Sequence, residues 1–343
     1  MSHINRYASD LLRIGSMFSP GKLGNALSVF ESYHRSKITG KLASPRFPIS
    51  LSIEPTTSCN LRCPECPSGL RSFTRPTGML NPDLFKKVID EIHRDLLYLT
   101  FYFQGEPFLH PEFLDMVKYA SSKKIYTATS TNAHFINEKT ADEIVRSGLQ
   151  RLIISIDGTD QETYENYRIG GSLEKVLEGT RAIVAARKKL KSSSPYLVFQ
   201  FLVVKQNEHQ VNDIKILARK SGVDRVVFKT AQVYDYEHGN ALIPSIDKYS
   251  RYRENADGTF SVKNKLLNHC WKLWHSCVIT WDGKVLPCCF DKDASFEMGN
   301  VKENSFHEIW KNEKYRSFRS SLMQSRKEIS ICRNCTEGTK VWA

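Results

Sequence analysis

The chain after residue 48 alternates between two patterns of apolar and polar positions. Six short apolar runs, rich in β-branched and aromatic residues, predict β-strands, and segments with helical spacing lie between them. The runs lie at residues 49–55, 98–104, 125–131, 151–157, 196–204 and 225–230. Residues that favour helix N-termini open four of the intervening segments: Asn81, Asn137, Ser172 and Asn207. The pattern predicts a repeated βα unit and therefore an α/β fold.

The six predicted strands favour a partial barrel over a complete one. Continuous apolar runs are typical of parallel strands that helices bury on both faces, and right-handed crossovers wind such units into a sheet or a barrel. A closed barrel needs eight units, so six predict a partial (β/α)6 TIM-like barrel with an open side. Periodicity alone does not separate it from a doubly wound sheet. The predicted regions are a helical N-terminal extension (1–47), the barrel (48–231), a linker (232–262) and a small cysteine-rich α+β domain (263–343).

Composition and the first residues narrow the location. Hydrophobic residues make up 41% and charged residues 25% of the 343 positions, which is typical of a globular protein. Asp10 and Arg13 interrupt the apolar core that a signal peptide would need, and no apolar run approaches the length of a membrane span. We therefore expect a cytoplasmic protein. Its nine cysteines would stay reduced there, so their clustering indicates metal binding or redox chemistry.

The net charge of +12 allows several kinds of partner. The basic residues are scattered and no aromatic-basic signature occurs, so nucleic acid is not expected. Residues 1–49 hold seven Lys and Arg against Asp10 and Glu31. A helical cover for the barrel is favoured there over an anchor on a membrane surface.

Three cysteines, Cys59, Cys63 and Cys66, come directly after the first predicted strand. Barrel enzymes build their active sites at this end of the strands. Structural zinc is usually bound by four ligands in two pairs, whereas this loop offers three thiolates. A 4Fe–4S cluster bound by three cysteines would leave one iron open to a substrate or cofactor. A zinc knuckle is the alternative.

The C-x3-C-x2-C spacing of these cysteines resembles the signature of the radical S-adenosylmethionine (SAM) superfamily, and the resemblance covers residues 48–343. It implies that SAM binds the open iron, that an electron from the cluster cleaves SAM to a 5′-deoxyadenosyl radical, and that this radical removes a hydrogen atom from a substrate C–H bond. Gln104, Gly105, Glu106 and Pro107 resemble the GGEP motif that meets the SAM amino group. Gln104 replaces the first glycine of that motif.

The same resemblance implies further contacts with SAM at the ends of the third and fourth strands and in the segment after them. The residues are Ser130, Asn132, Ser155, Asp157 and Arg168. Ordinary strand-end turns and a solvated surface arginine are the alternatives. Many members of the superfamily place an aromatic residue before the third cysteine, next to adenine. Glu65 stands there in this chain, so the adenine contact stays unassigned.

The C-terminal cysteines resemble the SPASM/twitch extension of radical SAM enzymes, which carries auxiliary 4Fe–4S clusters. The resemblance implies one such cluster, and the best ligands are Cys270, Cys288, Cys332 and Cys335. Cys277 is a possible alternative ligand, and a zinc ribbon is the alternative site. Cys289 and Asp291 lie near the position where some relatives carry a catalytic base, so they are candidates whose role stays unassigned.

The resemblance implies a radical SAM oxidoreductase or maturase. An auxiliary cluster near the substrate could accept the electron left behind, which would give a net oxidation. The substrate expected is a small alcohol or sugar-like metabolite, as in an aminoglycoside-pathway enzyme with a single twitch cluster, or a ribosomal peptide that gains a crosslink or an oxidised residue. A non-catalytic iron–sulfur or zinc scaffold is the remaining hypothesis. The basic surface would suit an acidic electron donor such as a flavodoxin or ferredoxin.

Overall fold

The structure, a computed structural model, describes residues 3–338. Its main sheet has nine strands in the order β11-β10-β9-β1-β2-β3-β4-β5-β6. Strands β1 to β6 pair with one another in parallel, which confirms the partial barrel. Their bounds are β1 Ser50–Ile53, β2 Tyr98–Thr100, β3 Tyr126–Thr131, β4 Arg151–Ser155, β5 Tyr196–Val203 and β6 Arg225–Thr230. All six predicted strands are present, several with earlier ends.

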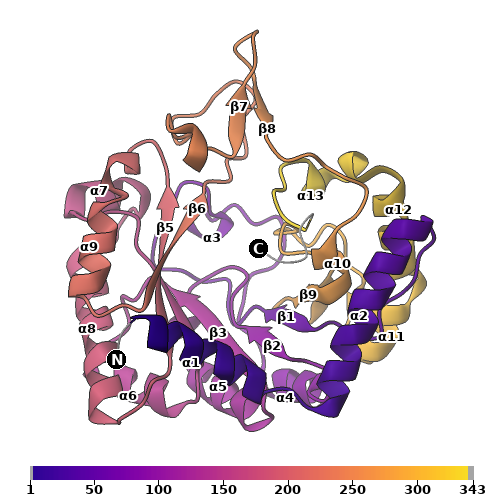
Figure 1. Ribbon diagram of the computed structural model, residues 1–343, viewed down its shortest axis with the longest axis horizontal. Helices are drawn as coiled ribbons and strands as arrows, with labels where there is room; N and C mark the ends of the chain where they lie inside the picture. Colours follow the sequence, from indigo (N-terminus) through magenta and orange to yellow (C-terminus); the bar gives the residue numbers. More distant parts are fainter. Residues whose placement is uncertain (1–2, 339–343) are drawn as a thin grey trace.

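Helices cover the outer side of these strands (Figure 1). They are α4 Pro82–Ile92, α5 Phe113–Ser122, α6 Glu138–Arg146, α7 Gln161–Tyr167, α8 Leu173–Lys189 and α9 Asp213–Lys220. Their apolar faces supply buried core residues such as Phe85, Val117 and Ile183. The side chains of Asn81, Asn137 and Ser172 accept hydrogen bonds from backbone N–H groups of the first turn, so these three predicted caps are confirmed.

The prediction that Asn207 caps a helix is wrong. Its side-chain amide donates to the carbonyls of Asp157 and Leu202, both at 2.9 Å, and its side-chain oxygen accepts from Val204. The residue therefore joins the ends of β4 and β5. Helix α9 begins only at Asp213.

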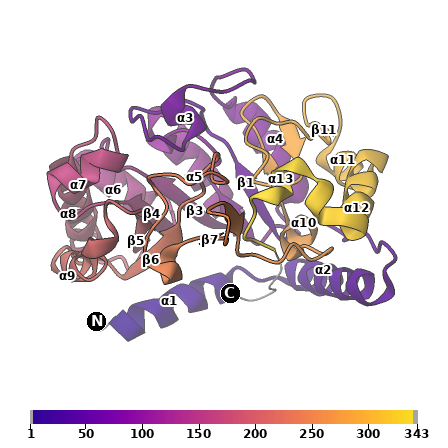
Figure 2. The same ribbon diagram turned by 90° about the horizontal axis from the view of Figure 1, so that it is seen from above.

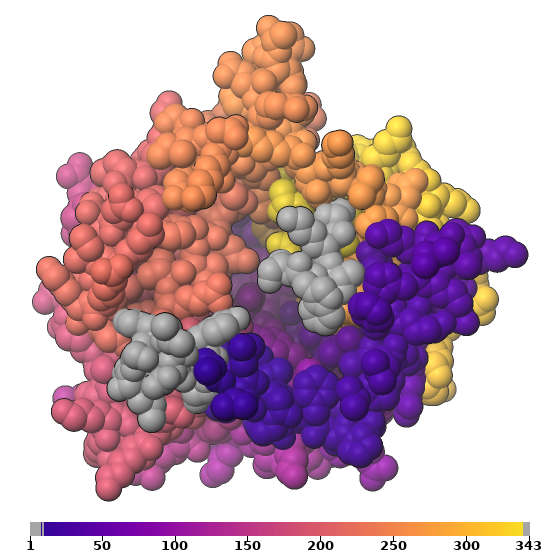
Figure 3. All heavy atoms as spheres, in the orientation of Figure 1, coloured from indigo at the N-terminus to yellow at the C-terminus, as the bar shows by residue number. Residues whose placement is uncertain are grey.

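The N-terminal residues form two helices, α1 His3–Ser16 and α2 Pro20–Thr39, which lie along one face of the molecule (Figure 2). The buried Asp10 carboxylate accepts hydrogen bonds from Tyr126 and Arg151, the first residues of β3 and β4. Asn25 donates to the carbonyl of Asp95, in the turn before β2. The two helices therefore contact the amino-terminal ends of the strands. The space-filling view shows them on the molecular surface, in indigo (Figure 3).

The cysteine-rich region extends the sheet of the barrel. β9 Ser276–Ile279 pairs in parallel with β1, and β10 Lys284–Leu286 and β11 Gly299–Asn300 follow in antiparallel pairs. The remaining elements of this region are helical: α10 Trp271–His275, α11 Phe306–Lys311, α12 Glu313–Ser325 and α13 Ser330–Arg333. The segment predicted as a linker holds a hairpin of β7 Tyr252–Glu254 and β8 Phe260–Val262. The domain bounds themselves stay a prediction.

A buried ion pair joins the barrel to the C-terminal strands. Glu54, directly after β1, is fully buried, and Arg75 donates to its two carboxylate oxygens at 2.6 and 2.9 Å. Arg75 also donates to the carbonyl of Lys292 at 2.8 Å, and Trp281 donates its backbone N–H to Glu54 at 3.3 Å. One carboxylate thus fixes the end of β1, the segment after the cysteine loop and the C-terminal region.

No helix in residues 3–338 combines the length and the apolar composition needed to cross a membrane.

Candidate active site

The three N-terminal cysteines lie in the loop between β1 and the short helix α3, Pro67–Leu70. All three line one pocket of about 130 Å³. A side chain on Gly69 would stand 2.5 Å from the backbone nitrogen of Cys63, so only glycine lets α3 pack onto the loop. Burial raises the pKa of the Cys59 thiol to about 11 and also raises that of Cys63. Metal binding here would therefore have to release protons.

The motif after β2 forms one wall of this pocket. Gly105 has φ +74°, and a side chain there would collide with the carbonyl oxygen of Thr56, so the position requires glycine. Its N–H donates to the Ser68 hydroxyl at 2.9 Å. The Gln104 side chain meets the Cys66 sulfur at 3.9 Å. Gln104 and Pro107 lie beside the pocket rather than in its lining.

Glu106 joins the ends of β2 and β3. Its carboxylate accepts hydrogen bonds from the Thr131 hydroxyl at 2.7 Å and from the backbone N–H groups of Asn132 and Phe108 at 2.8 and 3.3 Å. Desolvation outweighs these bonds and raises the pKa of Glu106 to about 7. The carboxyl group therefore changes its charge near neutral pH.

The other predicted SAM contacts lie around the same pocket. Ser130, Asn132, Ser155 and Arg168 line it. The Asn132 side-chain amide lies 3.9 Å from the Cys59 sulfur, and the Ser130 and Ser155 hydroxyls are 3.3 Å apart. Asp157 is buried outside the lining and accepts from Arg168 Nε at 2.5 Å. It therefore orients Arg168, whose Nη1 lies 3.6 Å from the Cys63 sulfur.

The sequence patterns missed Tyr102 and Phe103, which also line the pocket. Both come just before the Gln104 motif at the end of β2, and their place at a strand end is the signal that could have found them. Glu65, at the position where relatives carry an aromatic residue, accepts a hydrogen bond from the backbone of Tyr234 at 3.0 Å. Its carboxylate is thus bound to the segment before the hairpin.

The C-terminal cysteines form a second group. The thiols of Cys270, Cys332 and Cys335 interact electrostatically with one another and with Arg326, and Cys288 interacts with Cys270. The four residues named as the best ligands are therefore close together, although 65 positions separate Cys270 from Cys335 in the sequence. In residues 3–338, no three His, Cys, Asp or Glu side chains are spaced to hold a single ion.

Two family models match the chain in the regions that hold these two groups. The model of the radical SAM superfamily matches residues 53–215, and the SPASM model, an iron-sulfur cluster-binding domain, matches residues 270–336. The chain belongs to the radical SAM superfamily. It is therefore an enzyme. Its radical SAM domain implies a 4Fe–4S cluster and SAM as cofactors, and its SPASM domain implies auxiliary iron–sulfur clusters.

Curated relatives of this radical SAM enzyme differ in what they act on. The tungsten-containing aldehyde ferredoxin oxidoreductase cofactor-modifying protein of Pyrococcus furiosus is 24% identical over 312 residues, 78% of this chain and 82% of its own. The PqqA peptide cyclase of Gluconobacter oxydans is 26% identical over 320 residues, 87% of this chain and 85% of its own. The solved structure of Streptococcus suis SuiB bound to S-adenosylmethionine has a TM-score of 0.63 at 16% identity and covers 90% of this chain and 76% of its own, which shows the same fold.

Two further residues that the sequence singled out, Cys277 and Asp291, are buried in the C-terminal region of the radical SAM enzyme. Cys277 is buried in β9, where its thiol lies beside Tyr315, which also interacts electrostatically with Cys288. Asp291 is buried and accepts from the backbone N–H groups of Ser295 and Phe296 at 2.8 and 2.9 Å. Both of its carboxylate oxygens therefore shape a turn, and its role in catalysis stays unassigned.

Cys289 differs from Cys277 because its neighbours lower the pKa of its thiol, whereas the pKa of Cys277 is raised. A hydrogen bond from the Cys288 thiol and then the ammonium group of Lys272 lower its pKa. Tyr102 interacts electrostatically with both Lys272 and Cys289. Cys289 thus lies on the side of the second group that faces the barrel.

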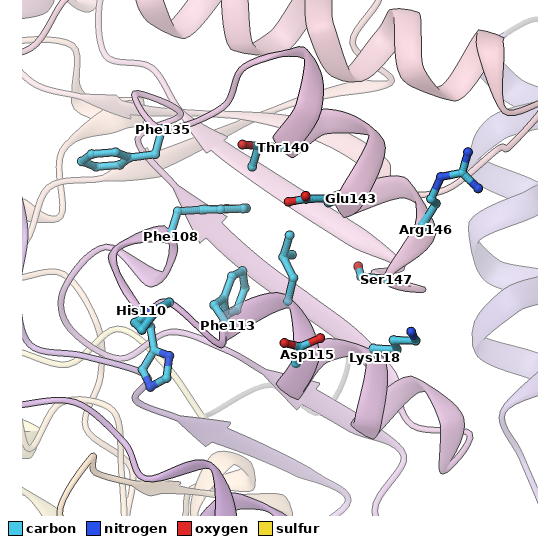
Figure 4. Close-up of a pocket in the computed structure, with 12 residues that line it drawn as sticks. Phe108, His110, Phe113, Asp115, Lys118, Phe135, Thr140, Glu143, Arg146 and Ser147 are labelled. Carbon is cyan, nitrogen blue, oxygen red and sulfur yellow. The ribbon is translucent and has the colours of Figure 1, made fainter.

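A separate groove of about 480 Å³ lies on the outer helices, between α5 and α6. Phe108 and Phe135 lie at one end of it, with Asp115, Lys118 and Glu143 farther along (Figure 4). None of the nine cysteines lines this groove. The cysteines of the first group line a different pocket.

Replacing Glu106 with Gln is expected to remove a pH dependence of stability. The raised pKa means that the folded protein holds the proton more tightly, so the stabilisation is complete below about pH 4.5 and is lost as the pH rises through about 7. Wild type should lose about 3 kcal/mol more than Glu106→Gln across this window. Urea unfolding at pH 4.5 and 7.5 measures the difference, and Glu138→Gln, an exposed site on α6, is the control. Equal losses in wild type and Glu106→Gln would contradict the assignment.

Proposed function

We propose that this enzyme oxidises its substrate by removing a hydrogen atom from an unreactive C–H bond and passing the electron left behind to one auxiliary 4Fe–4S cluster. When bound, SAM and the N-terminal cluster supply the 5′-deoxyadenosyl radical. The substrate loses one hydrogen atom to that radical, one electron to the auxiliary cluster and one proton to a base or solvent. Both radical chemistry and water exclusion suit the interior of a barrel.

The observation that carries this proposal is that Lys292 and Tyr102 interact with residues of both cysteine groups or beside them. Lys292 interacts electrostatically with Cys66 of the first group and with Cys289 beside the second. Tyr102 lines the first pocket and interacts with Lys272 and Cys289. A substrate between them would lie near both redox centres.

The side chains around the first pocket have distinct proposed tasks. Cys59, Cys63 and Cys66 would hold the SAM-binding cluster. Arg168, oriented by Asp157, would hold the SAM carboxylate by its guanidinium. The other polar groups proposed to contact SAM are those of the Gln104–Pro107 motif, Ser130, Asn132 and Ser155.

The second group would hold the auxiliary cluster through Cys270, Cys288, Cys332 and Cys335. Cys277 lies in β9 beside Tyr315 and stays an alternative ligand. Cys289 is adjacent to the set and interacts with Tyr102 of the first pocket, which supports a place next to the substrate. Its task in catalysis stays a prediction.

A peptide is the favoured substrate class. The support is the likeness to the PqqA peptide cyclase, which covers most of both chains. The small alcohol or sugar-like substrate expected from the cysteine pattern stays a prediction, as does an acidic flavodoxin or ferredoxin as donor. The net charge of +12 supports such a donor, and its reduction of the enzyme should slow as ionic strength rises.

Anaerobic reconstitution tests the function. The protein loaded with iron and sulfide should hold about eight iron atoms and, with SAM and dithionite, release 5′-deoxyadenosine and methionine. A scaffold would release neither. Peptides and small alcohols are then added separately, and mass spectrometry should find a product that has lost two hydrogen atoms in the peptide arm. A dehydrogenated alcohol with no change in any peptide would overturn the peptide assignment.

A further inference from the structure

Arg326 is a fully buried arginine beside the second cysteine group. It directly follows α12, and its Nη2 lies 3.4 Å from the Cys335 sulfur. The same guanidinium donates to the backbone carbonyls of His269 at 3.2 Å and Glu337 at 2.7 Å. Its charge interacts with the thiols of Cys270, Cys332 and Cys335. Three of the four proposed ligands therefore surround one guanidinium.

This guanidinium makes no ion pair with a carboxylate within residues 3–338. A buried charge without a partner is strongly unfavourable, so a compensating negative charge is expected nearby. Cysteine thiolates on a 4Fe–4S cluster would supply it, because their sulfur atoms carry the negative charge of the bound site. The surroundings of Arg326 therefore fit a charged cluster.

The arginine at the first cysteine group is balanced differently. Arg168 lies 3.6 Å from the Cys63 sulfur, but the Asp157 carboxylate neutralises it at 2.5 Å. Arg326 has carbonyl oxygens and sulfur around it instead. The arginine nearest the second site therefore contributes a positive charge that no carboxylate neutralises, whereas the arginine nearest the first site is neutralised by Asp157.

We propose that Arg326 raises the reduction potential of the auxiliary cluster and so makes it the electron acceptor. Reduction adds one negative charge, and a fixed guanidinium at hydrogen-bond distance from a ligand sulfur stabilises the reduced state. Because the low dielectric of the interior screens little, the effect is larger than it would be at the surface. This inference rests on the proposed function, in which the auxiliary cluster takes the substrate electron.

The test is a redox titration of the loaded full-length protein, followed by electron paramagnetic resonance. SAM shifts the signal of the N-terminal cluster alone, which separates the two clusters. In Arg326→Gln the equilibrium constant for reducing the auxiliary cluster should fall at least tenfold, which is about 59 mV for one electron. Arg326→Lys keeps the charge but loses the forked donor, so the reduction potential of its auxiliary cluster should lie between those of Arg326→Gln and wild type. The N-terminal cluster should not change.

Arg316→Gln is the matched control, because it removes the same charge from an exposed site on α12. It should leave both potentials unchanged. A loaded Arg326→Gln protein with the wild-type potential would overturn the proposal. If Arg326→Gln holds no iron, Arg326→Met decides, because it removes the charge and keeps a long side chain: a wild-type potential there would mean that Arg326 is only structural. A wild-type protein with both clusters that releases no 5′-deoxyadenosine would refute the proposed function, while the potential would still be measured.

Discussion

Replacing Cys59, Cys63 and Cys66 together with alanine is expected to abolish 5′-deoxyadenosine release. The three thiols line one pocket, and the superfamily binds its SAM cluster through three cysteines, so no ligand for that cluster would remain. The iron content should fall from about eight to about four atoms per chain, because the second cysteine group is intact. Iron analysis and chromatography of the reaction products measure both effects.

Cys277→Ala is the control for this variant. Cys277 is buried in β9 beside Tyr315 and is not one of the three N-terminal thiols, so its loss should disturb packing while the N-terminal iron and SAM cleavage stay at the wild-type level. A triple variant that keeps all its iron and still cleaves SAM would show that the N-terminal site is assigned to the wrong residues.

Replacing Arg75 with Met is expected to lower the free energy of unfolding by about 3–5 kcal/mol, because it leaves the fully buried Glu54 carboxylate without its partner. The hydrogen bond from Arg75 to the Lys292 carbonyl is lost as well. Backbone amides of β9 and of the segment around Lys292 should therefore exchange faster with deuterium. Chemical unfolding and hydrogen exchange measure the two effects.

Arg35→Ala is the matched control, because it breaks an exposed ion pair with Glu31 on α2. Pairs in solvent contribute little, so the loss should stay below about 1 kcal/mol. An Arg75→Met protein as stable as Arg35→Ala would mean that the Glu54–Arg75 pair does not join the barrel to the C-terminal strands.

The local part of the fold follows from the sequence. Alternating strand and helix patterns predicted β1 to β6, and three of four predicted caps hold because a cap depends on residues within one turn. Asn207 failed because its side chain bonds to Asp157 and Leu202 on two strands. The sequence pattern does not indicate whether such a side chain bonds to its own helix or to distant strands.

The candidate site divides in the same way. The spacing of Cys59, Cys63 and Cys66 predicted a shared site because the eight residues from 59 to 66 cannot spread them far apart. Sequence spacing could not predict the contacts of Arg326 and Asp291. A buried arginine among thiols and a carboxylate bound by two backbone N–H groups are outcomes of packing.

Residue order and spacing are sufficient for the βα repeat, the three-cysteine loop and the membership in the radical SAM superfamily, since these depend on short stretches of chain. Three-dimensional packing decides that β9 joins β1, that Cys270 meets Cys332 and Cys335, and that Lys292 lies between the two cysteine groups. These contacts join residues that are far apart along the chain. Their free energy comes from burial and pairing in the folded state, which no local pattern encodes.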